Sequence, residues 1–164
     1  LSGFDTGPLV GHLAAWNYFM SAESDVNDDF IEKWHAFIKD EKRVTNDPME
    51  AHFIGFNMWV KAVEKVGSTD VDVVRPAMYG ITYPNLTGGI AVMNTNHHLT
   101  KPVLIGEIQA DGQFETVWQT SGGVIGDAWT DHLPDSARLV ADWSAPIMCG
   151  NFNIDTSKCS GQNY

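Results

Sequence analysis

The stretch GGIAVMNTNHHLTKPVLIGEIQADGQFETVWQ, residues 88–119, carries the clearest pattern in the chain. Apolar residues recur at or near every second position, the spacing of strands that bury one face; they are Ile90, Val92, Val103, Ile105, Ile108, Phe114 and Val117. The segment ADGQ, residues 110–113, joins the last two runs, and Asp-Gly between alternating apolar residues is a strong hairpin signal. The stretch predicts three strands, with the polar residues 94–98 crossing between the first two.

The composition predicts a folded, acidic protein. Its 164 residues, 43% apolar and 11% aromatic, suffice for a packed core. The formal charge of −11 opposes binding to nucleic acid or to an anionic membrane surface. No apolar run approaches the roughly 18 to 20 residues that span a bilayer, so we expect no membrane insertion. The first residues show neither an initiator Met nor a signal sequence, so we expect a processed or cut chain.

The two cysteines, Cys149 and Cys159, lie in a polar, glycine-containing tail. Thiols there would be exposed, so a disulfide is the natural interpretation, and it implies an oxidising compartment. Two unpaired thiols are the alternative. A two-ligand metal site is disfavoured because no His lies between the cysteines.

Upstream of the stretch the pattern is mainly helical. Residues 13–19, ending in Trp16-Asn17-Tyr18-Phe19, read as a buried strand, although periodicity does not separate so short a run from a buried helix. Ser24 and its neighbours cap a helix over about residues 26–39. Its expected apolar face is Phe30, Ile31, Trp34, Phe37 and Ile38.

A second helix begins at Asn46-Asp47-Pro48 and runs to Val66, before Gly67. Asn or Asp caps it, proline takes the first helical position, and Glu50 completes a capping box. Its expected core face is Phe53, Phe56, Val60 and Val63, widened by Ala51, Ile54, Met58 and Ala62. A third, short helix over residues 71–79 contains Pro76, which predicts a kink or a loosely bonded last turn.

Four separated motifs resemble one protein family. They are GHLAAWNYF (11–19), RVTNDPMEA (43–51), AVEKVGSTDVD (62–72) and NHHLTKP (96–102), and they resemble the urea-binding component of urea ABC transporters, a branch of the type I periplasmic solute-binding proteins. The tail, residues 143–162, resembles C-terminal extensions of some members. Pro76 departs from the family pattern, which has an ordinary helix former there.

The resemblance implies part of a two-lobed α/β fold, with three-layer α/β/α lobes, three inter-lobe crossings and a ligand in the cleft. Complete members are considerably longer, so the chain corresponds to a C-terminal part. On this plan residues 1–19 end the second-lobe sheet, 20–93 form first-lobe helices and a strand, and 94–126 return to the second lobe with the hairpin. Residues 127–164 form an irregular C-terminal extension with the Cys loop.

The candidate ligand-binding residues are Trp16, Asn17, Tyr18, Asn46, Asp47 and Glu50. An amide ligand needs carbonyl or carboxylate acceptors and aromatic walls that exclude water. The alternatives are a core aromatic cluster for the first three residues and simple helix capping for the last three.

His97 and His98 are expected to act at a hinge, hydrogen-bonded across the crossing segment. A metal site using them with His12, His35, His52 or His132 is disfavoured, because adjacent histidines in a strand point to opposite faces and no His-x-x-x-His spacing occurs.

The resulting expectation is an extracytoplasmic protein, periplasmic or extracellular, that binds urea or a short-chain amide without a cofactor or catalysis and delivers it to an ABC permease. The rivals are a cytoplasmic amide sensor of the same fold, a metal-dependent hydrolase, and a structural or assembly protein. We also expect a companion that covers the exposed apolar surface, either the missing N-terminal half or a second copy. The isolated chain should not bind urea measurably in calorimetry, because the cleft needs groups from both lobes, and binding tighter than about a millimolar constant would contradict this expectation.

Overall fold

The computed structural model describes residues 3, 5–126 and 136–159. The chain forms two compact units, Leu1–Gly126 and Asp127–Tyr164. The elements of the first unit are η1 (Gly7–Leu9), β1 (Leu13–Trp16), α1 (Asp25–Ile38), α2 (Asp47–Val66), α3 (Val71–Met78), β2 (Thr82–Pro84), β3 (Ile90–Met93), β4 (Leu99–Thr100), β5 (Leu104–Ile108) and β6 (Phe114–Gln119). Those of the second are η2 (Ser136–Arg138), β7 (Leu139–Asp142), β8 (Cys149–Asn153) and β9 (Lys158–Cys159).

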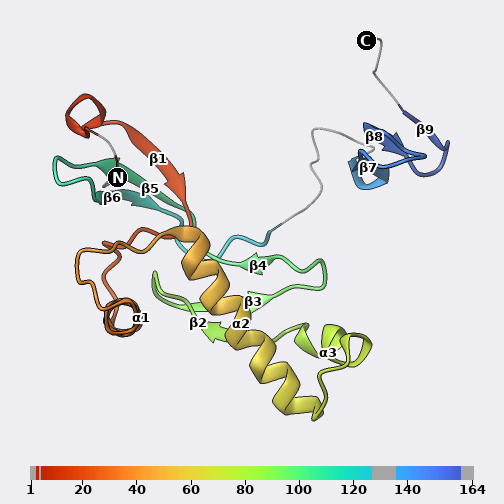
Figure 1. Cartoon of the computed structure of the whole chain (residues 1–164), viewed down its shortest axis with the longest axis horizontal. Coiled ribbons are helices and arrows are strands. Elements are labelled where there is room, and N and C mark those ends of the chain that lie inside the picture. The colour runs from red at the N-terminus through yellow and green to blue at the C-terminus, as the bar shows by residue number, and fades with distance from the viewer. Residues whose placement is uncertain (1–2, 4, 127–135, 160–164) are drawn as a thin grey trace. The chain divides into compact units, whose positions relative to one another are not determined.

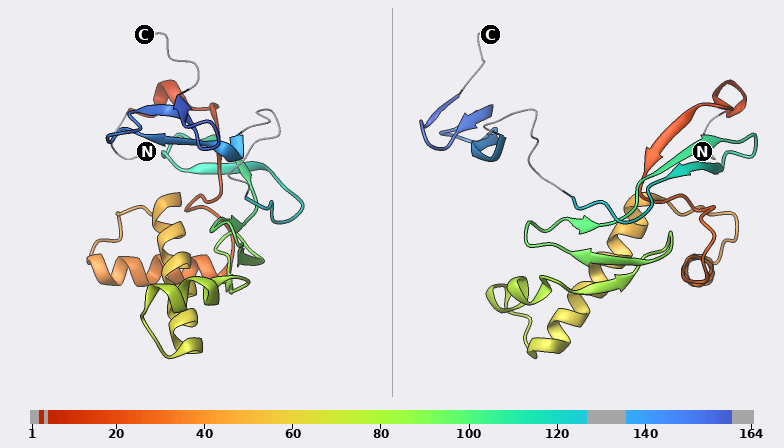
Figure 2. Two further views of the ribbon diagram at one scale, coloured as in Figure 1. Left: turned by 90° about the vertical axis from the view of Figure 1, so that its right-hand side faces the viewer. Right: turned by 180° about the vertical axis from the view of Figure 1, so that it is seen from behind.

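The first unit contains two antiparallel three-stranded sheets, ordered β1-β5-β6 and β2-β3-β4. The long helix α2 runs beside the second sheet, and α3 lies near the C-terminal end of α2 (Figures 1 and 2). The chain passes between the part with β1, β5 and β6 and the part with the helices three times. It does so after β1, between β4 and β5, and after β6.

The predicted hairpin is confirmed. β5 and β6 pair with Ile108 opposite Phe114. Gly112 has φ 80°, in the region that favours glycine, and its N–H donates to the carbonyl of Gln109 at 3.0 Å. A register shift at Ile105/Gly106 interrupts the ladder. The Asp-Gly signal therefore identified both the turn and the strands that it joins.

The position of the crossing segment needs correction. Residues 94–98 turn the chain from β3 to β4 within one sheet, and the Asn94 N–H donates to the carbonyl of His98 at 2.9 Å. The passage to the other sheet comes later, between Thr100 and Leu104. The sequence did not predict the short strand β4, because its two residues, Leu99 and Thr100, are too few to show a period.

The expected buried faces of the strands were partly wrong. β1 ends at Trp16, and Leu13 and Trp16 are 62% and 49% exposed, whereas Tyr18 and Phe19 just beyond it are buried. In β3 the buried residues are Ala91 and Met93 rather than the expected Ile90 and Val92. Both faces of so short a strand carry apolar residues, so sequence alone does not determine which face turns inward.

The first two helices lie where their caps predicted them. The Ser24 hydroxyl accepts from the Asn27 N–H at 3.1 Å, and α2 ends at Gly67 with φ 65°. At the start of α2, Asn46 Oδ1 accepts from the Met49 N–H at 3.0 Å. In α3, Pro76 has no N–H to donate, and the Tyr79 N–H closes the helix with a long 3.3 Å bond to the Pro76 carbonyl, in line with the loosely bonded last turn that was expected.

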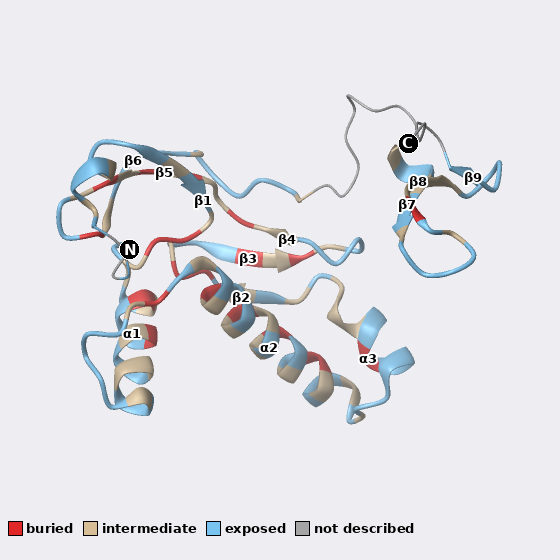
Figure 3. Ribbon diagram, turned by 45° about the horizontal axis from the view of Figure 1, so that its top comes forward, coloured by how far each residue is buried: buried red, intermediate tan, exposed pale blue. Residues whose placement is uncertain are grey.

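The buried face of α2 differs from the expected one. Ile54, Met58 and Ala62 are fully buried, whereas Phe56 is 63% exposed and stacks on Trp59. The core also contains Tyr18, Phe30, Leu86, Ala91 and Met93, so it joins α1, α2 and β3 (Figure 3). The apolar residues of α2 surround most of the helix, and only its neighbours select the face that packs.

The second unit is more regular than the irregular extension that was expected. β7, β8 and β9 form a small antiparallel sheet, and a disulfide joins Cys149 to Cys159, as predicted. The bond links the start of β8 to the end of β9. Strands this short, separated by turns, show no alternation from which to predict them.

One close contact in the first unit gives a test of the packing. A Cβ at Gly106 would lie 2.6 Å from the Phe19 ring and 3.1 Å from Phe114 Cβ. Phe19 and Phe114 stack with centroids 4.5 Å apart, so neither ring is free to move away. We expect Gly106→Ala to lower the free energy of unfolding by about 1–3 kcal/mol in urea denaturation.

Gly55→Ala is the matched control, because a Cβ there meets nothing within 4 Å and Gly55 lies inside α2. It should stabilise the protein by about 0.5–1 kcal/mol through helix propensity. Equal effects of the two substitutions would show that the Phe19–Phe114 stack does not constrain the strand.

Candidate functional site

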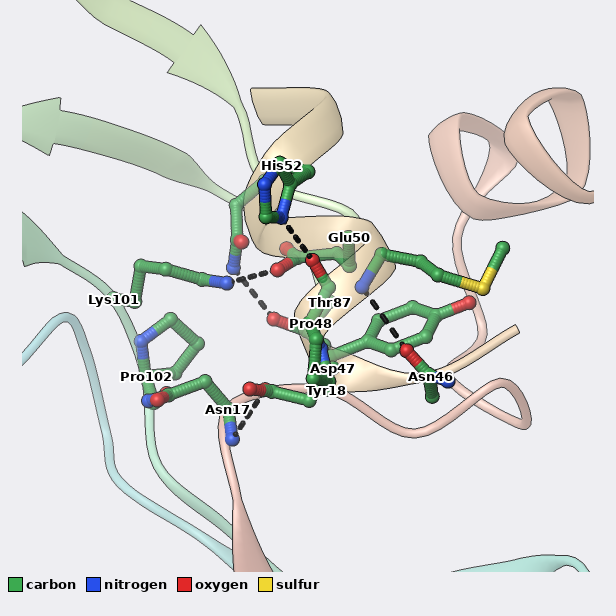
Figure 4. Close-up of polar contacts among 12 residues, drawn as sticks. Asn17, Tyr18, Asn46, Asp47, Pro48, Glu50, His52, Thr87, Lys101 and Pro102 are labelled. Carbon is green, nitrogen blue, oxygen red and sulfur yellow. Dashed lines mark hydrogen bonds and ion pairs between the residues drawn. The ribbon is translucent and has the colours of Figure 1, made fainter. Parts of the chain in front are cut away.

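The first and second of the three passages between the two sheets meet at the first turn of α2 (Figure 4), and the third is paired with the second. In the first passage, the Asn17 N–H donates to Asp47 Oδ1 at 3.1 Å. Asn17 Nδ2 also donates to the carbonyl of Pro102, in the second passage, at 2.7 Å. The second and third passages are joined by two backbone hydrogen bonds between Lys101 and Val124. Segments far apart in sequence are thereby fixed beside one helix terminus.

A pocket of ≈ 390 Å³ opens beside this junction. It is lined by Gly3, Trp16, Tyr18, Phe19, Met20, Val44, Thr45, Asn46, Asp47, Pro48, Gly112, Gln113 and Phe114. Four of the six predicted ligand residues therefore border one pocket: Trp16, Tyr18, Asn46 and Asp47. A larger hollow along α1, ≈ 1150 Å³, is lined mainly by charged residues and includes none of the six.

Tyr18 belongs mainly to the core, the alternative that the sequence left open. Its side chain is 1% exposed, and its hydroxyl bonds to Asn27 Oδ1 at 2.8 Å and Thr45 Oγ1 at 2.7 Å. Asn27 Nδ2 donates in turn to the carbonyls of Met20 and Ala22. Burial raises the pKa of Tyr18 to about 12, against the opposing effect of the Thr45 hydrogen bond. This network ties together Tyr18, Thr45 and Met20, three residues of the pocket wall.

Asn46 and Asp47 occupy the helix terminus at the pocket's edge. Asn46 caps α2, and Asp47, in the first helical turn, accepts from Asn17. A carboxylate at a helix N-terminus is stabilised by the helix dipole. Trp16, 49% exposed, supplies an aromatic surface. Together they provide two acceptor-bearing side chains and one aromatic face.

Glu50 does not line this pocket and does not complete a capping box. It is fully buried, and its carboxylate forms an ion pair with Lys101, itself 7% exposed. Burial raises the pKa of Glu50, the charge and hydrogen bond of Lys101 oppose that shift, and Asp47 adds to it. Among the described residues, Glu50 Oε1 has no hydrogen-bond partner.

Lys101 is the site residue that sequence reasoning missed. It stands between Thr100 and Pro102 in one of the family-like motifs, where a lysine reads as an ordinary exposed residue. Its partner Glu50 is 51 positions away, so no local spacing reveals the pair.

The two adjacent histidines lie in the β3–β4 turn. His97 has φ 65° and its Nε2 is 3.2 Å from the Tyr79 hydroxyl. His98 Nδ1 is 3.2 Å from the Asn96 carbonyl, and Asn96 Nδ2 donates to the carbonyl of Gly126 at 2.8 Å. The turn thus contacts the third passage, and a hinge role for the two histidines stays a prediction. Over residues 5–126 and 136–159 no three His, Cys, Asp or Glu side chains gather around a metal-sized space, and His132 lies outside the described residues.

Comparison with known proteins identifies the fold. A solute-binding protein of an ABC transporter from Rhodopseudomonas palustris BisB5, in complex with 3,4-dihydroxybenzoic acid, superposes with a TM-score of 0.62 at 15% identity. The match covers 72% of this chain and 33% of that one. A leucine-binding protein from Thermotoga maritima superposes with a TM-score of 0.56 at 16% identity, over 69% of this chain and 31% of that one. The fold is therefore the type I periplasmic-binding-protein fold, of which this chain forms a part.

The family follows from the sequence profile of the periplasmic binding protein domain, which matches residues 1–135. The chain belongs to this family. A limonene hydroxylase from Geobacillus stearothermophilus is 30% identical over 135 residues, which is 82% of this chain and 24% of that protein. The chain thus spans about a quarter of that relative and about a third of the solved structures. The predicted assignment of residue ranges to the two lobes stays a prediction.

The Tyr18 network gives a pH-dependent test. The pKa of Tyr18 is about 12 in the folded protein and about 10 when exposed, so folding favours the neutral phenol. Its contribution to stability is fully present below about pH 10 and is lost as the pH rises through about 12. We expect Tyr18→Phe to remove this part of the alkaline loss while costing about 1–3 kcal/mol at pH 7, because Asn27 and Thr45 lose a partner.

Denaturation at pH 7 and at several values between about 9 and 12, together with spectrophotometric titration of tyrosine, measures both effects. Tyr83→Phe is the control, since the Tyr83 ring packs against the same core and its hydroxyl has no hydrogen bond to another of the described residues. Identical alkaline slopes for wild type and Tyr18→Phe would contradict the buried network.

Proposed function

We propose that this chain is the C-terminal part of an extracytoplasmic substrate-binding protein that delivers a small polar ligand to an ABC permease. The family membership, the two-sheet architecture with three passages and the pocket at their junction support this proposal. The role proposed is binding without catalysis.

We propose urea or a short-chain amide as the ligand. The observation that carries this choice is the character of the pocket: among the described residues that line it there is no Lys, Arg or His, and its one charged side chain is Asp47. Amide N–H groups seek carboxylate and carbonyl acceptors, and Asp47 and Asn46 carry such oxygens at the pocket edge. The Trp16 and Phe114 rings offer flat walls suited to a planar ligand.

A carboxylate ligand is the second candidate, because one structural neighbour is in complex with 3,4-dihydroxybenzoic acid and another is a leucine-binding protein. A carboxylate next to Asp47 would need a cation within hydrogen-bond reach. The described lining supplies none, so such a ligand would depend on groups from outside this chain. The two candidate ligands therefore differ in charge: an amide is neutral, whereas a carboxylate is negative and lacks a cation in the described lining.

The proposed location is outside the cytoplasm. The Cys149–Cys159 disulfide suits an oxidising compartment and counts against a cytoplasmic sensor. Among the described residues, no helix is long and apolar enough to span a bilayer.

Ligand titration followed by amide and indole NMR shifts of the isotope-labelled chain tests the proposal. Acetamide should give saturable shifts at the Trp16 indole and at Asn46 and Asp47, with a dissociation constant weaker than about 1 mM, because only part of the cleft is present. Benzoate should shift these signals little. Asp47→Asn should weaken the response to acetamide, whereas Asp29→Asn, on the exposed side of α1, should not.

Saturable shifts with benzoate and none with acetamide would overturn the amide assignment. Shifts with neither ligand, or acetamide shifts spread evenly over the surface, would overturn the placement of the site at the junction.

A further inference from the structure

The second passage is tied to each of the other two at adjacent residues. Lys101 exchanges two backbone hydrogen bonds with Val124, of 3.2 and 2.7 Å. The next residue, Pro102, accepts a 2.7 Å hydrogen bond from Asn17 in the first passage. Two successive residues therefore hold all three passages side by side.

The Lys101 side chain connects this bundle of passages to α2. Its ammonium group bonds to Glu50 in the first turn of the helix, and Glu50 is fully buried. Asn17 reaches the same turn through its N–H bond to Asp47 at 3.1 Å. The contacts form a closed ring that runs from Lys101 to Glu50, along α2 to Asp47, through Asn17 to Pro102, and back to Lys101.

The ion pair is the part of this ring that neither water nor another side chain readily replaces. Lys101 and Glu50 lie away from solvent, and their side chains are 8% and 0% exposed. The Glu50 oxygen Oε1 has no partner among the described residues, so Lys101 supplies the contact that satisfies the carboxylate. A buried charge that loses its one partner is strongly unfavourable, which restricts the ring to arrangements that keep the pair together.

We propose that Glu50 and Lys101 are positioning residues that lock the three passages against α2 and thereby set the relative orientation of the β1-β5-β6 sheet and the helical part. The same ring includes the Asn17–Asp47 contact beside the pocket. The proposal concerns the geometry of the chain itself and holds whatever ligand the pocket takes.

Distances between two spin labels measure this orientation directly. One label is placed at Lys65→Cys in the last turn of α2 and the other at Glu115→Cys on β6, both exposed positions. The native cysteines are joined in a disulfide and do not react. With Glu50 and Lys101 unchanged, the two spin labels should give one narrow distance distribution. Lys101→Met and Glu50→Gln should each broaden it.

Three controls separate locking from a general loss of structure. Lys101→Arg keeps the charge and should keep the distribution narrow. The exchange Glu50→Lys with Lys101→Glu restores an ion pair and should narrow it relative to either single change. Lys33→Met breaks the exposed pair with Asp29 and should leave the distribution unchanged.

Retention of the helical circular dichroism signal confirms that each variant is folded. If Lys101→Met does not fold, the test is made with Glu50→Gln, which is nearly isosteric with the native residue. A narrow, wild-type distribution in a folded single variant would overturn the proposal. A folded charge-exchange variant as broad as the single variants would also overturn it.

Discussion

The buried ion pair between Glu50 and Lys101 is the contact on which the arrangement of the first unit depends. Two charges inside a protein attract strongly, yet each loses its hydration, so such a pair adds little net stability compared with apolar residues. Loss of one partner, in contrast, typically costs about 3–5 kcal/mol because the other charge stays buried. The pair therefore acts less as a source of stability than as a restriction on where α2 and the second passage can lie.

Close approach of the third passage to the residues just before Lys101 adds to this restriction. A Cβ at Gly123 would lie 2.7 Å from the Thr100 side chain, and one at Gly126 would lie 2.6 Å from His98 Cβ. The third passage can thus lie against the β3–β4 turn only because these residues lack side chains. Gly106 plays the same part for β5 beside Phe19. Glycine at these places serves contact between segments and not a special backbone angle.

Local chemistry made the helices and the hairpin predictable. Ser24, Asn46 and Gly67 mark helix ends through short-range hydrogen bonds or a left-handed residue, and Asp111-Gly112 marks the hairpin. The disulfide was predictable because both cysteines lie in one short polar tail. Each of these features is determined within a few residues of sequence.

Features that depend on distant partners were not predictable. The inward faces of β3 and α2 depend on which neighbours pack against them, so Ala91 is buried and Phe56 is exposed. Of the candidate ligand residues, Trp16, Tyr18, Asn46 and Asp47 came together in one pocket, while Asn17 holds the passages and Glu50 lies beneath them. Lys101 gave no local signal, since its role arises only when residue 50 folds next to it.

A double-mutant cycle on Glu50 and Lys101 tests the central claim most directly. The free energy of unfolding is measured by urea denaturation for wild type, Glu50→Gln, Lys101→Met and the double variant. We predict that each single change costs about 3 kcal/mol or more and that the double change costs less than their sum by about 1–3 kcal/mol, because the second substitution removes the unpaired group left by the first. Additivity of the two changes within about 0.5 kcal/mol would contradict the account.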